Sequence, residues 1–196
     1  MSAEFSAQSL QVPSWQLMPE EVFMHKERMR GFTLFELLTV IAIIGTLATI
    51  AHASYRDVVR RGHLYGAVDM IRMDIQKIRL EVLNSGEEHR IDFEPATGSY
   101  LLNGIHRVTL HRDVRYGAGP GVTGKPSQPY EPPPASGVTF KADGTNNRAV
   151  FLPKGAVVPT GAVYLTTGKE TMAITVALNG HLRLWRSRGG NKWDLQ

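Results

Sequence analysis

Residues 30–45 of this 196-residue chain read RGFTLFELLTVIAIIG, and this stretch decides the fold. It opens an apolar run from Phe32 to Ala53, 22 residues long, in which Glu36 is the single formal charge. A helix of that length rises about 33 Å, while the hydrocarbon core of a bilayer is about 30 Å thick. The stretch therefore predicts a membrane-spanning helix that carries one carboxylate.

The residues before the apolar run predict its orientation. Residues 25–30 read HKERMR, and basic residues that flank a span stay on the cytoplasmic side. We therefore expect the remainder of the chain to be exported. A cleaved secretory signal peptide is the alternative interpretation. Its apolar region has only about 7–15 residues, and here the sequence after the run continues in a helical pattern.

The composition narrows the class of function. Hydrophobic residues make up 42% and charged residues 20%, which excludes a disordered polar chain and a polytopic membrane protein. The mean hydropathy of −0.17 conceals the local apolar run. The absence of cysteine excludes disulfides, iron–sulfur clusters and thiol catalysis. Since the sequence also lacks a nucleophile elbow and a phosphate-binding glycine loop, we expect neither an enzyme nor a cofactor.

The helical pattern continues from Ser54 to about Asn84. Apolar residues recur there at steps of three and four, which places them on one face: Leu64, Val68, Ile71, Ile75, Ile78 and Val82. The opposite face carries Arg72, Asp74, Lys77, Arg79 and Glu81. The stretch from Asn84 to Gly86 is a typical helix end. We expect the apolar face to pack on the core of a following domain rather than in a coiled coil.

Short strands separated by turn residues follow Gly86. The expected strands are 90–93, 99–102, 106–110, 138–141, 149–153, 161–166, 171–178 and 181–186. We expect six or seven of these eight segments to form an antiparallel sheet covered by the apolar helix face, and hence an α+β fold. Residues 116–136 are rich in glycine and proline and predict a loop.

Glu36 is the first candidate functional residue. A charged side chain inside a span costs about 2.5–3.5 kcal/mol on insertion scales, so an acidic residue there points to a function. The helix offers no cation within reach of this carboxylate. If the chain were cut between Gly31 and Phe32, the new α-amine could pair with Glu36 of a neighbouring subunit. Such a pair would fix the axial register of packed helices.

The segment GFTLFEL at 31–37, directly opening a hydrophobic helix, resembles the type IV pilin and pseudopilin family. The resemblance implies that prepilin peptidase cuts after Gly31 and N-methylates Phe32, and that Glu36 acts in assembly with other subunits. It divides the chain into a leader at 1–31, a transmembrane helix at 32–53, an amphipathic helix at 54–86 and a periplasmic β-rich domain at 87–196. The leader is long for the family, so translation from Met18, Met24 or Met29 is an alternative. Many pilins have a kinking proline where this chain has Ala53, so we expect no such kink.

Two later segments, 137–145 and 173–183, resemble the GspH/FimT branch of this family. The branch contains a minor pseudopilin of type II secretion and a minor type IV pilin. The expected function is therefore that of a minor pilin or pseudopilin, held in the inner membrane and assembled into a filament.

A basic C-terminal segment supports an alternative function. Some FimT proteins bind DNA through a Gly-Arg-x-Arg motif, which aligns with 180–183 here, where His181 replaces the first arginine. The candidate DNA contacts are Arg183, Arg186, Arg188 and Lys192, interleaved with Trp185 and Trp193. Cationic side chains with aromatic neighbours suit sequence-independent DNA binding. A solvated basic tail is the other interpretation.

Two histidines are candidate metal ligands by residue type. His106 and His111 have no third partner at a ligand spacing in the sequence. We therefore expect them to be solvated or to lie on an edge strand.

Overall fold

The computed structural model describes residues 32–196 except 127, 129, 143 and 144, so Gly31 and the predicted leader at 1–31 lie outside the described residues. The chain divides into two compact units, of which the first ends at Gly45 and the second is Thr46–Gln196. Each unit is described by itself. The transmembrane and domain boundaries expected from the sequence remain predictions.

A single helix, α1 (Leu34–Ser85, 52 residues), runs through both units. Thr33 caps its start, because the Thr33 Oγ1 atom accepts a hydrogen bond of 3.1 Å from the Glu36 amide. At the other end, the Gly86 amide donates to the Val82 carbonyl over 2.9 Å. The helix is uninterrupted, as expected from the lack of proline within it.

The first sheet has the strand order β3-β2-β1-β7-β8, with every neighbouring pair antiparallel. Its strands are β1 (His89–Glu94), β2 (Ser99–Leu102), β3 (His106–Thr109), β7 (Arg148–Phe151) and β8 (Val157–Val158). The turn between β2 and β3 holds Asn103 at φ 54° and Gly104 at φ 71°. Two residues with positive φ are what a tight hairpin requires, so the Asn-Gly pair explains this turn.

The second sheet has the order β12-β11-β10-β9-β4 and is also antiparallel. Its strands are β4 (Arg115–Tyr116), β9 (Gly161–Thr166), β10 (Thr171–Val176), β11 (Leu182–Ser187) and β12 (Asp194–Leu195). Strand β10 is its centre and pairs along all six of its residues with both β9 and β11. A separate two-stranded ribbon consists of β5 (Lys141–Ala142) and β6 (Thr145–Asn146).

The expectation of one sheet of six or seven strands is therefore wrong. Strand β1 has β2 on one side and β7 on the other, and β9 has β10 on one side and β4 on the other. Because β1 and β9 each have a neighbouring strand on both edges, the two sheets cannot be joined by pairing β1 with β9. An isolated antiparallel bridge joins Val163 of β9 to Val138, a residue outside both sheets.

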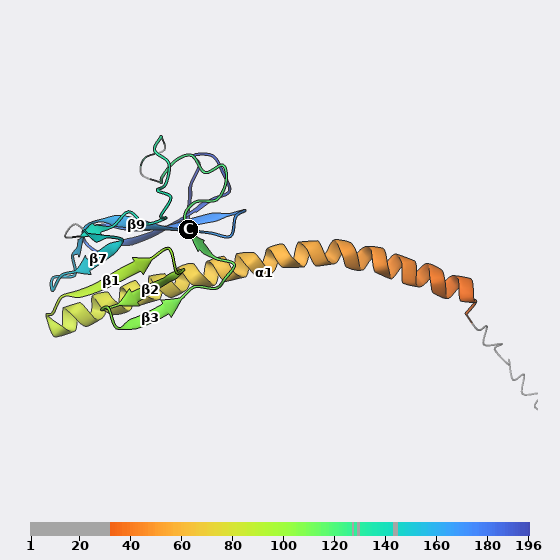
Figure 1. The fold of residues 1–196 in the computed structure, drawn as a ribbon, viewed down its shortest axis with the longest axis horizontal. Coiled ribbons are helices and arrows are strands. Elements are labelled where there is room, and N and C mark those ends of the chain that lie inside the picture. The colour runs from red at the N-terminus through yellow and green to blue at the C-terminus, as the bar shows by residue number, and fades with distance from the viewer. Residues whose placement is uncertain (1–31, 127, 129, 143–144) are drawn as a thin grey trace, which may run out of the picture. The chain divides into compact units, whose positions relative to one another are not determined.

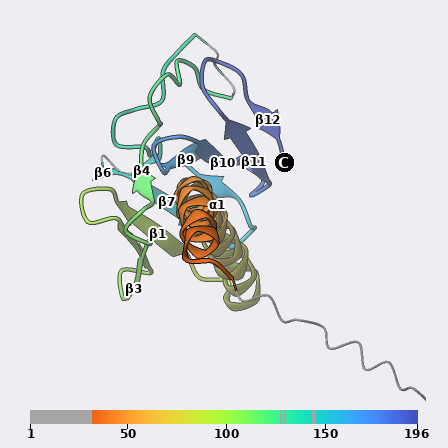
Figure 2. The same ribbon diagram turned by 90° about the vertical axis from the view of Figure 1, so that its right-hand side faces the viewer.

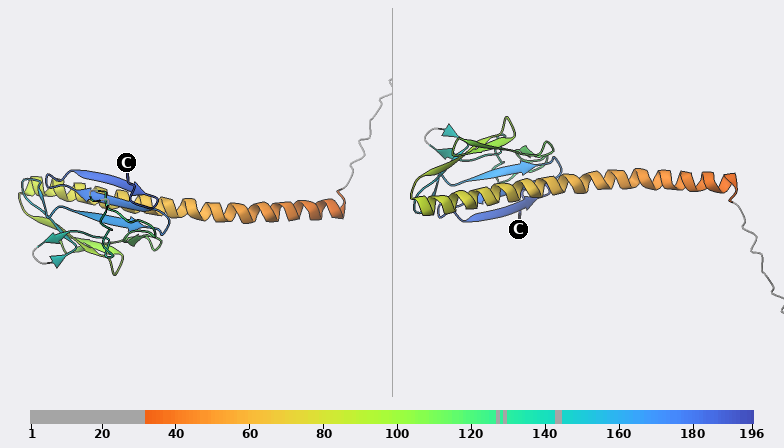
Figure 3. Two further views of the ribbon diagram at one scale, coloured as in Figure 1. Left: turned by 90° about the horizontal axis from the view of Figure 1, so that it is seen from above. Right: turned by 90° about the horizontal axis from the view of Figure 1, so that it is seen from below.

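The C-terminal half of α1 packs against both sheets (Figure 1). Seen along the helix, β1 and β3 lie on one side of it and β11 and β12 on the other (Figure 2). The predicted helix face is confirmed, since all six of its residues are at most 1% exposed: Leu64, Val68, Ile71, Ile75, Ile78 and Val82. One core cluster joins this face to aromatic and aliphatic residues of both sheets, among them Tyr100, Phe151, Leu165 and Ile174, and to Phe140, which precedes β5. The views in Figure 3 show the strands running alongside this half of α1.

The predicted loop at 116–136 begins one residue later, because Tyr116 belongs to β4. Its two ends meet at β9. The Gly117 amide donates to the Tyr164 carbonyl over 2.9 Å, and the Tyr164 amide donates to the Gly137 carbonyl over 2.7 Å. A Cβ on Gly137 would lie 2.1 Å from the Gly117 nitrogen, so the approach of the two ends requires glycine there.

Candidate functional site

The start of α1 exposes an apolar surface with no cover in the described chain. Phe32 is 82% exposed, and the leucines and isoleucines from Leu34 to Ile50 are all exposed. Among the described residues, α1 alone is long and apolar enough to cross a membrane, judged by length and composition; its most apolar stretch has a mean hydropathy of 2.2 and no buried residue. An uncovered apolar surface of this kind marks a membrane or protein contact.

Glu36 lies in the first turn of this exposed segment. Its backbone amide is bound by Thr33, and the Leu37 amide donates to the Thr33 carbonyl over 3.1 Å. The spacing Thr-x-x-Glu is a common helix start, in which an acidic residue near the positive end of the helix dipole is favourable. Since the cap uses the backbone amide of Glu36, its exposed side chain remains available to a partner.

The predicted DNA contacts Arg183 and Arg186 point to opposite faces of β11. Arg186 faces α1, where its Nη1 atom donates to the Tyr65 hydroxyl over 3.0 Å. Successive side chains alternate between the faces of a strand, and Arg183 lies three residues before Arg186. Arg183 therefore points to the face away from α1. Arg183 and Trp185 line a hollow of about 450 Å³ on the other face. The structure therefore does not bring the four predicted cations together.

Arg186 is occupied by contacts within the chain. Its Nε atom lies 2.9 Å from Oε1 of the buried Glu170, close enough for an ion pair but without hydrogen-bond alignment. Arg61 of α1 approaches the same carboxylate at 3.9 Å. The positive charge of Arg186 thus compensates for the cost of burying the Glu170 carboxylate, and its guanidinium is not free to bind a phosphate. Arg183, Arg188 and Lys192 are exposed.

The two tryptophans of this region are also held inside the domain. The Trp185 Nε1 atom donates to Thr175 Oγ1 over 3.0 Å, and the Trp193 Nε1 atom donates to the Gly124 carbonyl over 2.8 Å. The Trp193 ring meets Tyr164 edge to face, with centroids 5.9 Å apart. Burial, with a smaller contribution from the charge of Glu131, raises the pKa of Tyr164 to about 12. Both indoles are thus half-buried and fixed by hydrogen bonds to neighbouring segments.

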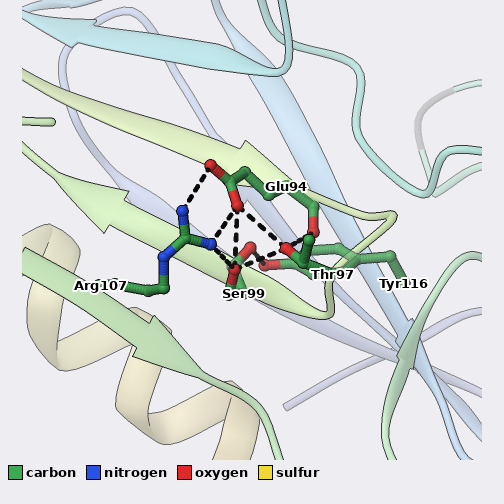
Figure 4. Close-up of polar contacts among 5 residues, drawn as sticks. All are labelled: Glu94, Thr97, Ser99, Arg107 and Tyr116. Atoms are coloured by element: carbon green, nitrogen blue, oxygen red, sulfur yellow. Dashed lines mark hydrogen bonds and ion pairs between the residues drawn. The ribbon is translucent and has the colours of Figure 1, made fainter.

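A polar network that sequence reasoning missed connects β1, β2 and β3 (Figure 4). Arg107 of β3 binds both carboxylate oxygens of Glu94, and its Nη1 atom donates to Ser99 Oγ over 2.8 Å. Thr97 and Ser99 also donate to Glu94 Oε2, over 2.9 and 3.1 Å. The Tyr116 hydroxyl donates to the Ser99 carbonyl over 3.1 Å. The turn residues around Glu94 indicated a hairpin, but nothing local indicated the arginine 13 residues later.

The chemistry of this network is structural. The hydrogen bond from Arg107, followed by that from Thr97, lowers the pKa of Glu94 below its ordinary value of 4.5, which makes the carboxylate a weak base. Of the two hydroxyls that donate to it, Ser99 is buried and Thr97 is exposed. The network fastens the hairpin, because Arg107 of β3 binds the carboxylate of β1 and the hydroxyl of β2 at the same time.

The N-terminal segment matches a known motif. Residues 27–51 match the prokaryotic N-terminal methylation motif, a range that contains Gly31, Phe32 and Glu36. No solved structure matches the chain.

The related sequences are fimbrial proteins. A fimbrial protein of Dichelobacter nodosus is 40% identical over 74 residues, which are 37% of this chain and 45% of the relative. Fimbrial protein EcpC of Eikenella corrodens is 49% identical over 47 residues, 24% of this chain and 31% of the relative. A probable minor fimbrial protein of Dichelobacter nodosus is 43% identical over 63 residues, 31% of this chain and 37% of the relative.

The chain thus spans less than half the length of each of these relatives. The chain thus carries the prokaryotic N-terminal methylation motif and is similar over part of its length to fimbrial proteins, among them a type IV major fimbrial protein of Dichelobacter nodosus. The helix followed by antiparallel sheets is a pilin-like α+β architecture.

Proposed function

We propose that this protein is a minor subunit of a type IV pilus or of a type II secretion pseudopilus. Prepilin peptidase removes residues 1–31 and methylates the new α-amine of Phe32. The protein waits in the inner membrane, held by residues 32–53, with the domain at 87–196 on the periplasmic side, and then enters a filament through the start of α1. The observation that carries the proposal is the uncovered apolar start of α1 with Glu36 in its first turn, inside the matched methylation motif.

Glu36 gives the proposed assembly its register. Moving an unpaired carboxylate into an apolar filament core is unfavourable, so the position at which it meets a cation is preferred over others. The free α-amine of a neighbouring Phe32 supplies that cation once the leader is removed. The exposed apolar residues of the same segment then bury one another along the filament.

The GspH/FimT branch is supported by the later segments of the chain. Residues 173–183 comprise most of β10, the turn at Asn179 and Gly180, and the start of β11. This turn is held to the helix, because Arg79 Nη2 donates to the Asn179 carbonyl over 3.0 Å. The match to a probable minor fimbrial protein also favours a low-copy subunit.

Mass spectrometry of the membrane-extracted protein tests the processing. The full chain is expressed in a bacterial host together with a prepilin peptidase, and the expected product begins at a methylated Phe32. Gly31→Leu is expected to block the cut. A wild-type chain that keeps residues 1–31 in the presence of active peptidase would indicate an unprocessed membrane anchor and contradict the proposal.

A second experiment tests the assembly. Because the chain has no cysteine, single cysteines can be placed at Leu34 and Leu38 and cross-linked in assembled filaments. Glu36→Gln is expected to be cut normally but to lose the cross-links to other pilin subunits. Glu88→Gln, a matched change at an exposed carboxylate outside the helix, is expected to keep them. Equal cross-linking in both variants would show that assembly does not depend on Glu36.

Binding of DNA is a second candidate function, favoured by the exposure of Arg183, Arg188 and Lys192. We expect a gel shift with the full chain in mild detergent to weaken as salt rises, because phosphate contacts release counterions. The triple change of these three residues to alanine should abolish the shift. A shift that survives the triple change, or no shift at low salt, would reject this function.

A further inference from the structure

Three potential metal ligands meet beside α1. His63 lies on α1, and His111 and Asp113 lie in the segment between β3 and β4. His63 Nδ1 is 3.1 Å from Asp113 Oδ2, and His111 Nδ1 is 3.6 Å from the same oxygen. One ligand atom from each residue lies within 4.8 Å of the other two.

These separations match those around a small divalent cation. Zinc binds imidazole nitrogen and carboxylate oxygen at about 2.0–2.2 Å, so two ligands of a tetrahedral ion lie about 3.4 Å apart. The observed 3.1 and 3.6 Å fall on either side of that value. Two imidazoles and one carboxylate also form a donor set suited to zinc, copper or nickel rather than to calcium.

Local hydrogen bonds already hold the three side chains together. His63 Nδ1 is bonded to Asp113 Oδ2, and the Asp113 amide donates to His111 Nδ1 over 3.3 Å. The two imidazole rings are 3.6 Å apart at their centroids and tilted by 32°. An ion bound to both Nδ1 atoms would take the place of the proton between His63 and Asp113 and of the amide hydrogen bond to His111.

The cluster is open to solvent on one side. The side chains of His63 and Asp113 are each 32% exposed. A hollow of about 200 Å³ reaches Asp113 and is lined also by three arginines, Arg56, Arg60 and Arg112. It leaves room for a water molecule as a fourth ligand, while the three positive charges oppose a cation and keep its affinity modest.

We propose that His63, His111 and Asp113 bind a zinc-class divalent cation that fastens α1 to the segment between β3 and β4. The sequence does not indicate this cluster, because the partners of His111 are 2 and 48 positions away and are brought together only by the fold. His106 lies on the exposed strand β3 and is not part of the cluster.

Calorimetric titration with zinc chloride tests the site on the full, untagged chain in mild detergent. The expected result is one ion per chain and a thermal unfolding midpoint that rises relative to the same sample in EDTA. His63→Gln and Asp113→Asn should each weaken binding by about tenfold or more. The matched control His106→Gln should bind as the wild type does.

A spectroscopic measurement separates loss of the site from loss of the fold. Cobalt(II) in place of zinc is expected to give the visible absorption of a tetrahedral site in the wild type and in His106→Gln. The double variant His63→Gln/His111→Gln should lack it while its circular dichroism spectrum is unchanged. No ion bound to the wild type, or unchanged affinity in the double variant, would overturn the proposal.

Discussion

Arg186 shows how the fold changes the role of a single side chain. In the sequence it is one of four cations near the C-terminus. In the structure it lies over α1, with Glu170 and Tyr65 as its partners. The alternation of side chains along β11 separates it from Arg183, and that alternation was visible in the sequence as Leu182, Leu184 and Arg186 on one face.

Replacing Arg186 with alanine should lower the free energy of unfolding by about 2 kcal/mol, because it leaves a buried carboxylate with only the distant Arg61 as a partner. Arg188→Ala, an exposed position two residues later, should change it by less than about 0.5 kcal/mol. Denaturant unfolding of both variants measures the difference. Similar losses in the two would show that Glu170 does not need Arg186.

The Glu94 carboxylate makes the stability of the folded protein depend on pH. Its pKa is lowered in the folded protein, chiefly by Arg107, so its contribution to stability is complete above its ordinary value of 4.5 and is lost as the pH falls through the lower, folded value. We expect Glu94→Gln to reduce the thermal midpoint at pH 7, and we expect this deficit to shrink progressively as the pH falls below 4.5. Thermal unfolding of the wild type and the variant between pH 7 and pH 3 measures this deficit. Glu88→Gln is the control and should show no such trend. A deficit of constant size at all pH values would contradict the assignment.

At the scale of elements, α1 and the sheets differ in how far the sequence determines them. The buried helix face could be predicted residue by residue, because the steps of three and four are contained within the helix itself. Strand partners could not. Ile91 pairs with Leu102 on one side and Ala149 on the other, and no local pattern links 91 to 149. The strands could therefore be predicted where turn residues separate them, whereas their division into two sheets could not be predicted.

Ile75→Ala should lower the free energy of unfolding by about 2–4 kcal/mol, since Ile75 is 1% exposed in the centre of the core and its loss leaves a cavity. Met73→Ala, on the same helix but 61% exposed, should cost less than about 0.5 kcal/mol. Equilibrium denaturation gives both values. If Met73→Ala proves the more damaging, the buried face has been assigned to the wrong side of the helix.

At the scale of the whole molecule, the second unit contains everything that forms the core. Every residue of the main cluster lies at or beyond Leu64, while the exposed apolar start of α1 lies before it. The site at the helix start was predictable because Phe32 and Glu36 stand in one contiguous motif. The His63 cluster and the Glu94 network were not, because their members come from separate elements.

The fragment Thr46–Gln196 should therefore unfold cooperatively, with a thermal midpoint close to that of the full chain. Residues 87–196 alone, which lack the helix face, should not fold. Circular dichroism during heating distinguishes the two. A folded 87–196 fragment would show that the sheets form a core without α1.

The closure of the loop at Gly117 and Gly137 has a consequence for how this protein can vary. Both ends are fixed at Tyr164, so the chain between them leaves and re-enters the domain at nearly the same point. The entropy of closing such a loop rises only slowly with its length. Insertions near the fully exposed Tyr130 should thus be absorbed without disturbing either sheet. This position is suited to divergence between relatives and to the insertion of a foreign peptide.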